Sequence, residues 1–129
     1  RTGPLLAILD DNLGVVQTLM QALSSAGFRT EAFTSPQDLA QRALTTPPLD
    51  AYLLDWTLRD GDNIGYYIPT LRKSSPDAAM VVLSGHFDSG FIDPATRKLS
   101  DDYNLTLMSK PASTAAIVQN LLALMKHGR

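Results

Sequence analysis

The chain has 129 residues, of which 44% are hydrophobic and 19% are charged, and it carries a formal net charge of −2. These values are typical of one globular domain and argue against a disordered chain. The sequence has no basic cluster for nucleic acid, no cysteine for disulfide or thiol chemistry, and no apolar run near the ~20 residues that cross a bilayer. We therefore expect a cytoplasmic domain without membrane or nucleic-acid contacts.

The first half of the chain alternates short aliphatic runs with segments of helical spacing. A run with the length and composition of a buried strand occupies residues 5–9, residues 28–33 look like a second strand, and residues 51–54 are the third. After the first run, apolar residues at i, i+3, i+4 and i+7 predict one face of a helix that ends before Gly27. Ser35 and Pro36 are typical of a helix start, so a second helix is expected to run to about Leu44. The apolar face of the first helix comprises Val16, Leu19, Met20 and Leu23.

The second half of the chain is less regular. Further strand-like runs occupy residues 79–83 and 105–108. Pro69 stands among apolar residues of helical spacing, and we expect it to kink that helix because proline lacks the amide donor. Gly90 and Pro94 interrupt the spacing across residues 87–103, so the helix there is expected to be short, shifted or partly unwound. A closing helix follows, with an inward face of Ile117, Leu121, Leu124 and Met125.

Five strand–helix units without repeats predict one α/β domain over residues 1–129, with no separate effector domain. Its sheet would be doubly wound, five-stranded and parallel, with helices on both faces. In sheets of this kind the ligand site lies at the carboxyl ends of the strands.

Charged and polar residues stand where the predicted strands end. The first strand is followed by Asp10 and Asp11, the third by Asp55, the fourth by Ser84 and the fifth by Lys110. In a parallel sheet these ends share one edge, where three carboxylates repel one another unless a cation is bound. Mg²⁺ prefers such oxygen ligands, while a lysine and a hydroxyl suit an anion beside the ion. The set predicts phosphoryl transfer to a carboxylate.

Each of these residues also has a plain structural interpretation. Asp10 and Asp11 suit a helix start, and Asp55 suits a turn. Hydroxyl residues such as Ser84 often end strands, and Lys110 by itself would be a solvated side chain. The functional hypothesis therefore depends on the joint order of the residues along the chain.

The same order of motifs resembles the receiver domains of two-component response regulators. The matching segments are "LDDN" at 9–12, "LLDWT" at 53–57, "VVLSG" at 81–85 and "SKP" at 109–111. Each segment is short and unspecific alone, whereas their order on successive strand ends is specific. The resemblance covers about residues 4–126 and implies a flavodoxin-like (βα)5 fold.

The resemblance implies a site for Mg²⁺, or for Mn²⁺ in its place. Asp11 would bind the ion directly, Asp10 would bind it largely through water, and Thr57 would offer its main-chain carbonyl. Asp55 would be a ligand of the ion and also the phosphoacceptor.

The resemblance also implies contacts to the phosphoryl group. Ser84 would bond a phosphoryl oxygen, and Lys110 would pair with Asp55 or with the phosphoryl group. The peptide bond before Pro111 would be cis. His86 would tune the lifetime of the phosphoryl group, although a solvated loop histidine explains this residue equally well.

On this resemblance the chain is expected to be a phosphoacceptor signalling domain rather than a conventional enzyme. It would take a phosphoryl group from a histidine kinase or a phosphotransfer protein, catalyse its own phosphorylation and dephosphorylation, and change conformation to regulate an output. An effector domain in a longer chain and a second copy in a phosphorylation-linked dimer are further expected partners.

Four features depart from the family pattern. Arg59 stands where a proline is usual, and Leu107 stands where the fifth strand usually has an aromatic ring. The segment between Ser84 and Lys110 is a few residues longer than usual. Pro69 is expected to make the third helix irregular. None of these departures removes a group that phosphorylation needs, so they question the conformational switch rather than the phosphoacceptor.

Two alternatives stay open. A small Mg²⁺-dependent phosphatase of the haloacid dehalogenase type also uses an aspartyl nucleophile, but it needs a D-x-D motif where this chain has Asp10 and Asp11. A pseudo-receiver would bind partners without chemistry, and it would be expected to lack an acidic residue or the lysine, all of which are present.

Overall fold

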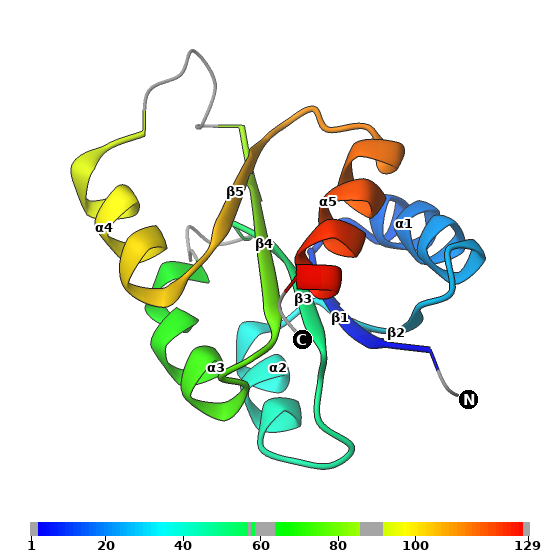
Figure 1. Ribbon diagram of the computed structural model, residues 1–129, viewed down its shortest axis with the longest axis horizontal. Coiled ribbons are helices and arrows are strands. Elements are labelled where there is room, and N and C mark those ends of the chain that lie inside the picture. Colours follow the sequence, from blue (N-terminus) through cyan, green and yellow to red (C-terminus); the bar gives the residue numbers. More distant parts are fainter. Residues whose placement is uncertain (1–2, 57, 59–63, 86–91, 128–129) are drawn as a thin grey trace.

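The computed structural model describes residues 3–56, 58, 64–85 and 92–127, which form one five-stranded sheet covered by helices on both faces (Figure 1). All neighbouring strands are parallel, in the order β2-β1-β3-β4-β5, so the predicted fold class is confirmed. The strands are β1 (Leu5–Leu9), β2 (Arg29–Phe33), β3 (Ala51–Asp55), β4 (Ala79–Ser84) and β5 (Thr106–Ser109). The helices are α1 (Leu13–Ser25), α2 (Pro36–Ala43), the 3₁₀ helix η2 (Ile64–Tyr66), α3 (Ile68–Ser74), α4 (Pro94–Tyr103) and α5 (Thr114–His127).

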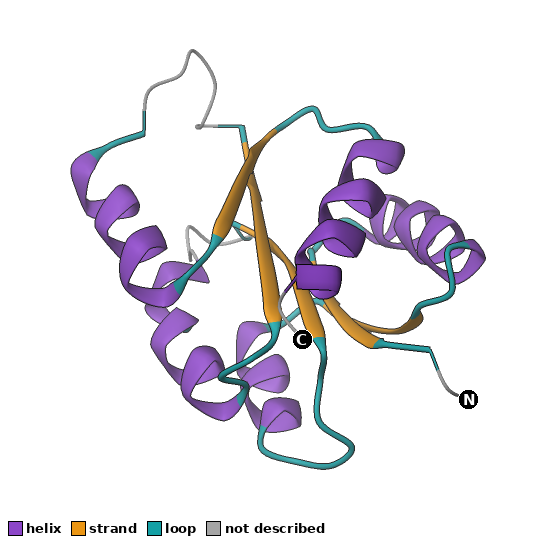
Figure 2. Ribbon diagram, in the orientation of Figure 1, coloured by secondary structure: helices purple, strands orange, loops and turns teal. Residues whose placement is uncertain are grey.

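The central strands β1, β3 and β4 are buried on both faces of the sheet. Helices α1 and α5 cover one face, and α2, α3 and α4 cover the other (Figure 2). Side chains alternate along a strand, so Leu5 and Leu9 of β1 join the core beneath α2 and α3, whereas Leu6 and Ile8 join the core beneath α1 and α5. Both sets must be apolar, which explains why the central strands are continuous aliphatic runs rather than alternating ones.

The helix boundaries follow from capping residues. Asn12 caps α1 by accepting a 3.2 Å hydrogen bond from the Val15 amide, and Gly27 follows that helix with φ of 101°. Ser35 caps α2 by accepting from the Asp38 amide at 3.3 Å, which confirms the predicted helix start. None of the helices in the described ranges is long and apolar enough to cross a membrane.

Two prolines begin helices instead of interrupting them. Pro69 lies in the first turn of α3, directly after η2, so the expected kink in a helix interior is wrong. Pro94 likewise stands in the first turn of α4, where Asp93 is the cap. A first-turn amide has no partner within its helix, so proline costs nothing there. Gly90, the other predicted breaker, lies outside the described residues.

Tyr52 ties β3 to the end of α3 inside the core. Its side chain is fully buried, and its hydroxyl shares a 2.7 Å hydrogen bond with the Ser75 hydroxyl. Burial raises the pKa of Tyr52 above the ordinary tyrosine value, and the Ser75 bond and the charges of Arg42 and Arg72 offset this only in part. The native state therefore keeps the phenol proton to a higher pH than the unfolded state does.

Replacing Tyr52 by phenylalanine should lower the free energy of unfolding by about 1–2 kcal/mol at pH 7, because the buried Ser75 hydroxyl loses this partner. The difference from the parent should shrink as the pH rises above about 10, where the unfolded parent releases its phenol proton first. Urea unfolding at several pH values measures both effects. Tyr66→Phe is the control, since Tyr66 is 83% exposed, and an equal loss in both variants would contradict the assignment.

Candidate functional site

Three carboxylates meet at the carboxyl edge of the sheet. Asp10 directly follows β1 and is 5% exposed, while Asp55 is the last residue of β3 and is 6% exposed. Asp11 is half-buried beside them. One carboxylate oxygen from each of the three residues lies within 4.8 Å of the other two. Because β1 and β3 are neighbours in the sheet, the predicted juxtaposition of the three aspartates is observed.

The turn between β1 and α1 holds this cluster in place. The Asp10 amide donates a 3.1 Å hydrogen bond to the carbonyl of Phe33, which continues the pairing of β1 with β2. The Asp10 carboxylate accepts a 2.9 Å hydrogen bond from the Asn12 amide, and Asn12 in turn caps α1. A carboxylate that is hydrogen-bonded to the backbone has a defined orientation, so Asp10 presents its charge at a fixed place.

Lys110 lies against the carboxylate of Asp55. Its Nζ is 2.9 Å from Oδ1 of Asp55, and the two side chains are 40% and 7% exposed respectively. The Lys110 amide also donates a 2.9 Å hydrogen bond to the carbonyl of Ser84, which holds the backbone of Lys110 beside the end of β4. The peptide bond between Lys110 and Pro111 is cis, as predicted. Lys110 therefore offsets part of the negative charge of the cluster and reaches it from a partly exposed position.

Ser84 ends β4 next to the same carboxylate. It is 2% exposed, and the residue before it, Leu83, pairs in register with Asp55 and accepts a 2.8 Å hydrogen bond from the Trp56 amide. The hydroxyl thus belongs to the strand end adjacent to Asp55, where the sequence predicted it. Two other predicted site residues, Thr57 and His86, lie outside the described residues.

Leu107, one of the positions that depart from the family pattern, lies on the fifth strand of the sheet. It packs, partly buried, against the core on the α2–α3–α4 face of the sheet. Arg59 lies outside the described residues.

A groove that the sequence did not indicate opens onto the site. It has a volume of about 740 Å³ and runs between α1 and the start of α5, with Asp10 and Lys110 in its lining. Val15 also lines the groove and is 40% exposed, and Leu13 in the first turn of α1 is 63% exposed. Both residues lie outside the buried face of α1. Apolar residues outside that face were the feature of the sequence that could have indicated the groove.

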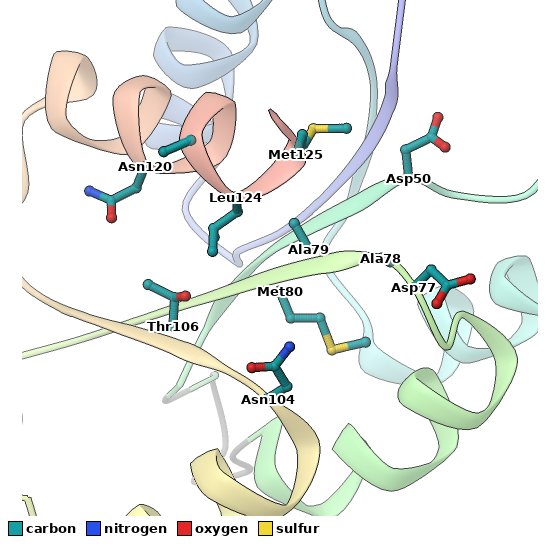
Figure 3. Close-up of a pocket in the computed structure, with 11 residues that line it drawn as sticks. Asp50, Asp77, Ala78, Ala79, Met80, Asn104, Thr106, Asn120, Leu124 and Met125 are labelled. Carbon is teal, nitrogen blue, oxygen red and sulfur yellow. The ribbon is translucent and has the colours of Figure 1, made fainter. Parts of the chain in front are cut away.

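A second hollow, of about 370 Å³, lies at the opposite edge of the sheet. Figure 3 shows residues around it from the starts of β4 and β5 and from the last turns of α5, including Thr106 and Leu124. In a parallel sheet all strands begin at one end and finish at the other, and this hollow lies at the end where the strands begin. The three carboxylates lie at the end where the strands finish. This hollow is therefore separate from the carboxylate cluster.

No protein-family model matches the chain. A curated relative is the photosynthetic apparatus regulatory protein RegA of Rhodovulum sulfidophilum, which is 33% identical over 121 residues. The match covers 91% of this chain and 63% of that protein, so the chain spans less than two thirds of the relative's length.

Solved structures share the arrangement of the whole chain. A CheY-like response regulator receiver domain protein from Methanospirillum hungatei superposes with a TM-score of 0.84 at 13% identity, over 98% of this chain and 97% of that one. A response regulator from Burkholderia pseudomallei, solved with a phosphorylated aspartic acid, a calcium ion and citrate, gives a TM-score of 0.76 at 21% identity, over 95% and 69%. At such identities the likeness is one of fold. The chain therefore has the fold of response-regulator receiver domains.

Proposed function

We propose that the chain is a phosphoacceptor signalling domain in which Asp55 takes a phosphoryl group from a phosphohistidine of a kinase or phosphotransfer protein. The single observation that carries the proposal is the placement of Asp55. Its carboxylate is nearly buried at a strand end, 2.9 Å from the ammonium group of Lys110 and within 4.8 Å of two further carboxylates. The relative RegA is called a regulatory protein, which agrees with a role in signalling.

The donor set of the cluster fits a hard divalent cation. The three ligand atoms are all carboxylate oxygens, which Mg²⁺ and Mn²⁺ prefer to nitrogen or sulfur ligands. We assign Asp11 and Asp55 as direct ligands, Asp10 as a ligand largely through water, and the main-chain carbonyl of Thr57 as a further ligand. A bound Mg²⁺ would supply positive charge that lowers the repulsion between the carboxylates and an incoming phosphate.

The side chains around Asp55 can perform the transfer. An Oδ atom of Asp55 forms a bond to phosphorus while the bond from phosphorus to the donor nitrogen breaks, and the donor imidazole leaves with that electron pair. The ammonium group of Lys110 stabilises the charge on the phosphoryl oxygens, and the Ser84 hydroxyl donates a hydrogen bond to one of them. Water can later attack the same phosphorus, and His86, two residues after Ser84 in the sequence, would affect that rate.

Incubation with acetyl phosphate and Mg²⁺ should add one phosphoryl group to the chain, as measured by intact mass. Asp55→Asn should abolish the addition because it removes the nucleophile, and EDTA should prevent it. Asp101→Asn, at an exposed position on α4, is the matched control and should be labelled like the parent. Labelling that persists in Asp55→Asn would contradict the proposal.

The cation site has its own test in the absence of any phosphate donor. Asp11→Asn should raise the free energy of unfolding without metal by about 1 kcal/mol, because it removes one of three mutually repelling charges. The same substitution should reduce the stabilisation that Mg²⁺ gives the parent. Thermal melts with and without Mg²⁺ measure both changes. If Asp11→Asn and the parent gained equally from Mg²⁺, the ion would bind elsewhere.

The groove beside the cluster is a suitable surface for the protein that delivers the phosphoryl group. It runs from Asp10 and Lys110 along α1, and the exposed side chains of Leu13 and Val15 add apolar area next to it. Exposed apolar patches at the mouth of a reactive site are typical of protein contacts. A small donor such as acetyl phosphate would not use this surface.

Leu13→Asp should therefore slow phosphoryl transfer from a phosphorylated histidine kinase at least about tenfold, the effect of losing a contact worth about 1.4 kcal/mol. Labelling by acetyl phosphate should stay at the parent rate. Leu44→Asp is the control, because Leu44 is 69% exposed at the end of α2 and lies outside the groove. Equal transfer rates in Leu13→Asp and Leu44→Asp would exclude the groove as the docking surface.

A further inference from the structure

The two helices that cover one face of the sheet carry almost no charge. Helices α1 and α5 contact each other on that face (Figure 1). Residues 12–28 and 111–125, which include nearly all of both helices, contain no acidic residue, lysine, arginine or histidine, although the chain has 11 basic and 13 acidic residues. Charged side chains ordinarily make up about a quarter or more of a protein surface. Burial accounts for their absence only where a helix faces the core.

The outward positions of these helices are uncharged as well. Val16, Leu19 and Leu23 form the buried side of α1, and Ile117 and Leu121 form that of α5. On the exposed side, residues at helical spacing form one stripe along each helix. We call these two stripes the neutral face, which comprises Thr18, Gln21 and Ser25 of α1 and Ala115, Gln119 and Leu122 of α5. Its side chains are amides, hydroxyls and apolar groups.

The helices on the opposite face of the sheet have a different composition. Each of α2, α3 and α4 carries charged side chains, namely Asp38, Arg42, Arg72, Lys73, Arg97, Lys98, Asp101 and Asp102. Exposed apolar side chains have the reverse distribution. Of the five large ones that are strongly exposed in the described ranges, Leu13, Val15 and Leu122 lie on α1 or α5. A surface that lacks charge and exposes apolar groups has the composition of the centre of a protein interface.

The groove beside the carboxylates does not account for this face. Within the neutral face, only Thr18 lines the groove. Both helices follow strands that end at the carboxyl edge of the sheet, so they run in the same direction and the groove lies at their amino ends. Gln119 and Leu122, which is 40% exposed, lie further along α5 and outside the groove. The rest of the neutral face therefore needs an occupant of its own.

We propose that the neutral face docks on the same face of a second copy of this chain, around a two-fold axis that passes beside Leu122. In a two-fold interface each patch meets its own copy, so a patch of one charge repels itself whereas an uncharged patch does not. A strongly acidic or basic partner would find no opposite charge on this face. The association does not require phosphorylation of Asp55 and is independent of the proposed function.

The polar side chains of the neutral face suit an identical partner. A side-chain amide both donates and accepts hydrogen bonds, so Gln21 and Gln119 can pair with glutamines of the second copy. The hydroxyls of serine and threonine have the same double capacity. The charged residues Asp11 and Lys110 precede the two helices, so they would fall at the rim of the interface, where charges stay in contact with water.

Sedimentation equilibrium of the unphosphorylated chain, from micromolar to submillimolar concentration, tests the inference. The mass of the parent should rise toward twice that of one chain. Leu122→Glu and Leu122→Lys should each raise the dissociation constant at least about tenfold, because two like charges then face each other across the axis. An equimolar mixture of the two variants should associate again, because the facing charges are then opposite.

Leu44→Glu is the matched control, because it places the same charge at an exposed leucine outside the neutral face and should associate like the parent. Equal association of Leu44→Glu and Leu122→Glu, or no association in the mixture of the two Leu122 variants, would overturn the arrangement. A monomeric parent would overturn it as well. If Leu122→Glu then slowed phosphoryl transfer from a phosphorylated histidine kinase but not from acetyl phosphate, the face would belong to the phosphodonor protein instead.

Discussion

The central constraint in this molecule is the repulsion between three carboxylates that the fold holds within 4.8 Å of one another. Asp10 and Asp55 are nearly buried, so they cannot relieve that repulsion by turning into solvent. A protein keeps such an arrangement only if something compensates the charge, and Lys110 does so in part from a distance of 2.9 Å. One ammonium group leaves part of the negative charge of three carboxylates uncompensated. The site therefore suits a divalent cation, and an anion can bind beside that cation.

The rest of the fold serves to place these groups. The strand order β2-β1-β3-β4-β5 reverses between β1 and β3, so helices leave the adjacent ends of these two strands on opposite faces. That is where a parallel sheet leaves a crevice, and it is where Asp10 and Asp55 lie. The aliphatic strands β1, β3 and β4 are buried on both sides by the two cores. In β1, β3 and β4, charged side chains therefore stand only at the carboxyl ends or just after them.

The sequence was sufficient for the parts that depend on local rules. The five strand-like segments predicted the strands to within one or two residues, and Ser35 and Gly27 marked a helix start and a helix end because caps act over a few residues. The juxtaposition of Asp10, Asp11 and Asp55 followed from the parallel sheet, since it needs only the strand order. These predictions use spacing along the chain or a single rule of topology.

Other features depend on contacts between distant residues, and the sequence could not supply them. Pro69 was expected to kink a helix, but a 3₁₀ turn ends just before it, so it occupies a first turn instead. The bonds of Arg72 join residues up to 32 positions apart, and no motif marks them. The groove along α1 depends on where α5 packs, which the apolar spacing of α5 alone does not determine.

Calorimetric titration of the unphosphorylated chain with Mg²⁺ tests the central claim most directly. It measures the affinity of the carboxylate cluster for a divalent cation without any phosphate chemistry. The account predicts binding of one ion per chain, with an affinity that falls in Asp55→Asn, since that variant loses one charge of the cluster. Absence of saturable binding by the parent would contradict the account. Binding with unchanged affinity in Asp55→Asn would contradict it equally, because the ion would then lie away from the three carboxylates.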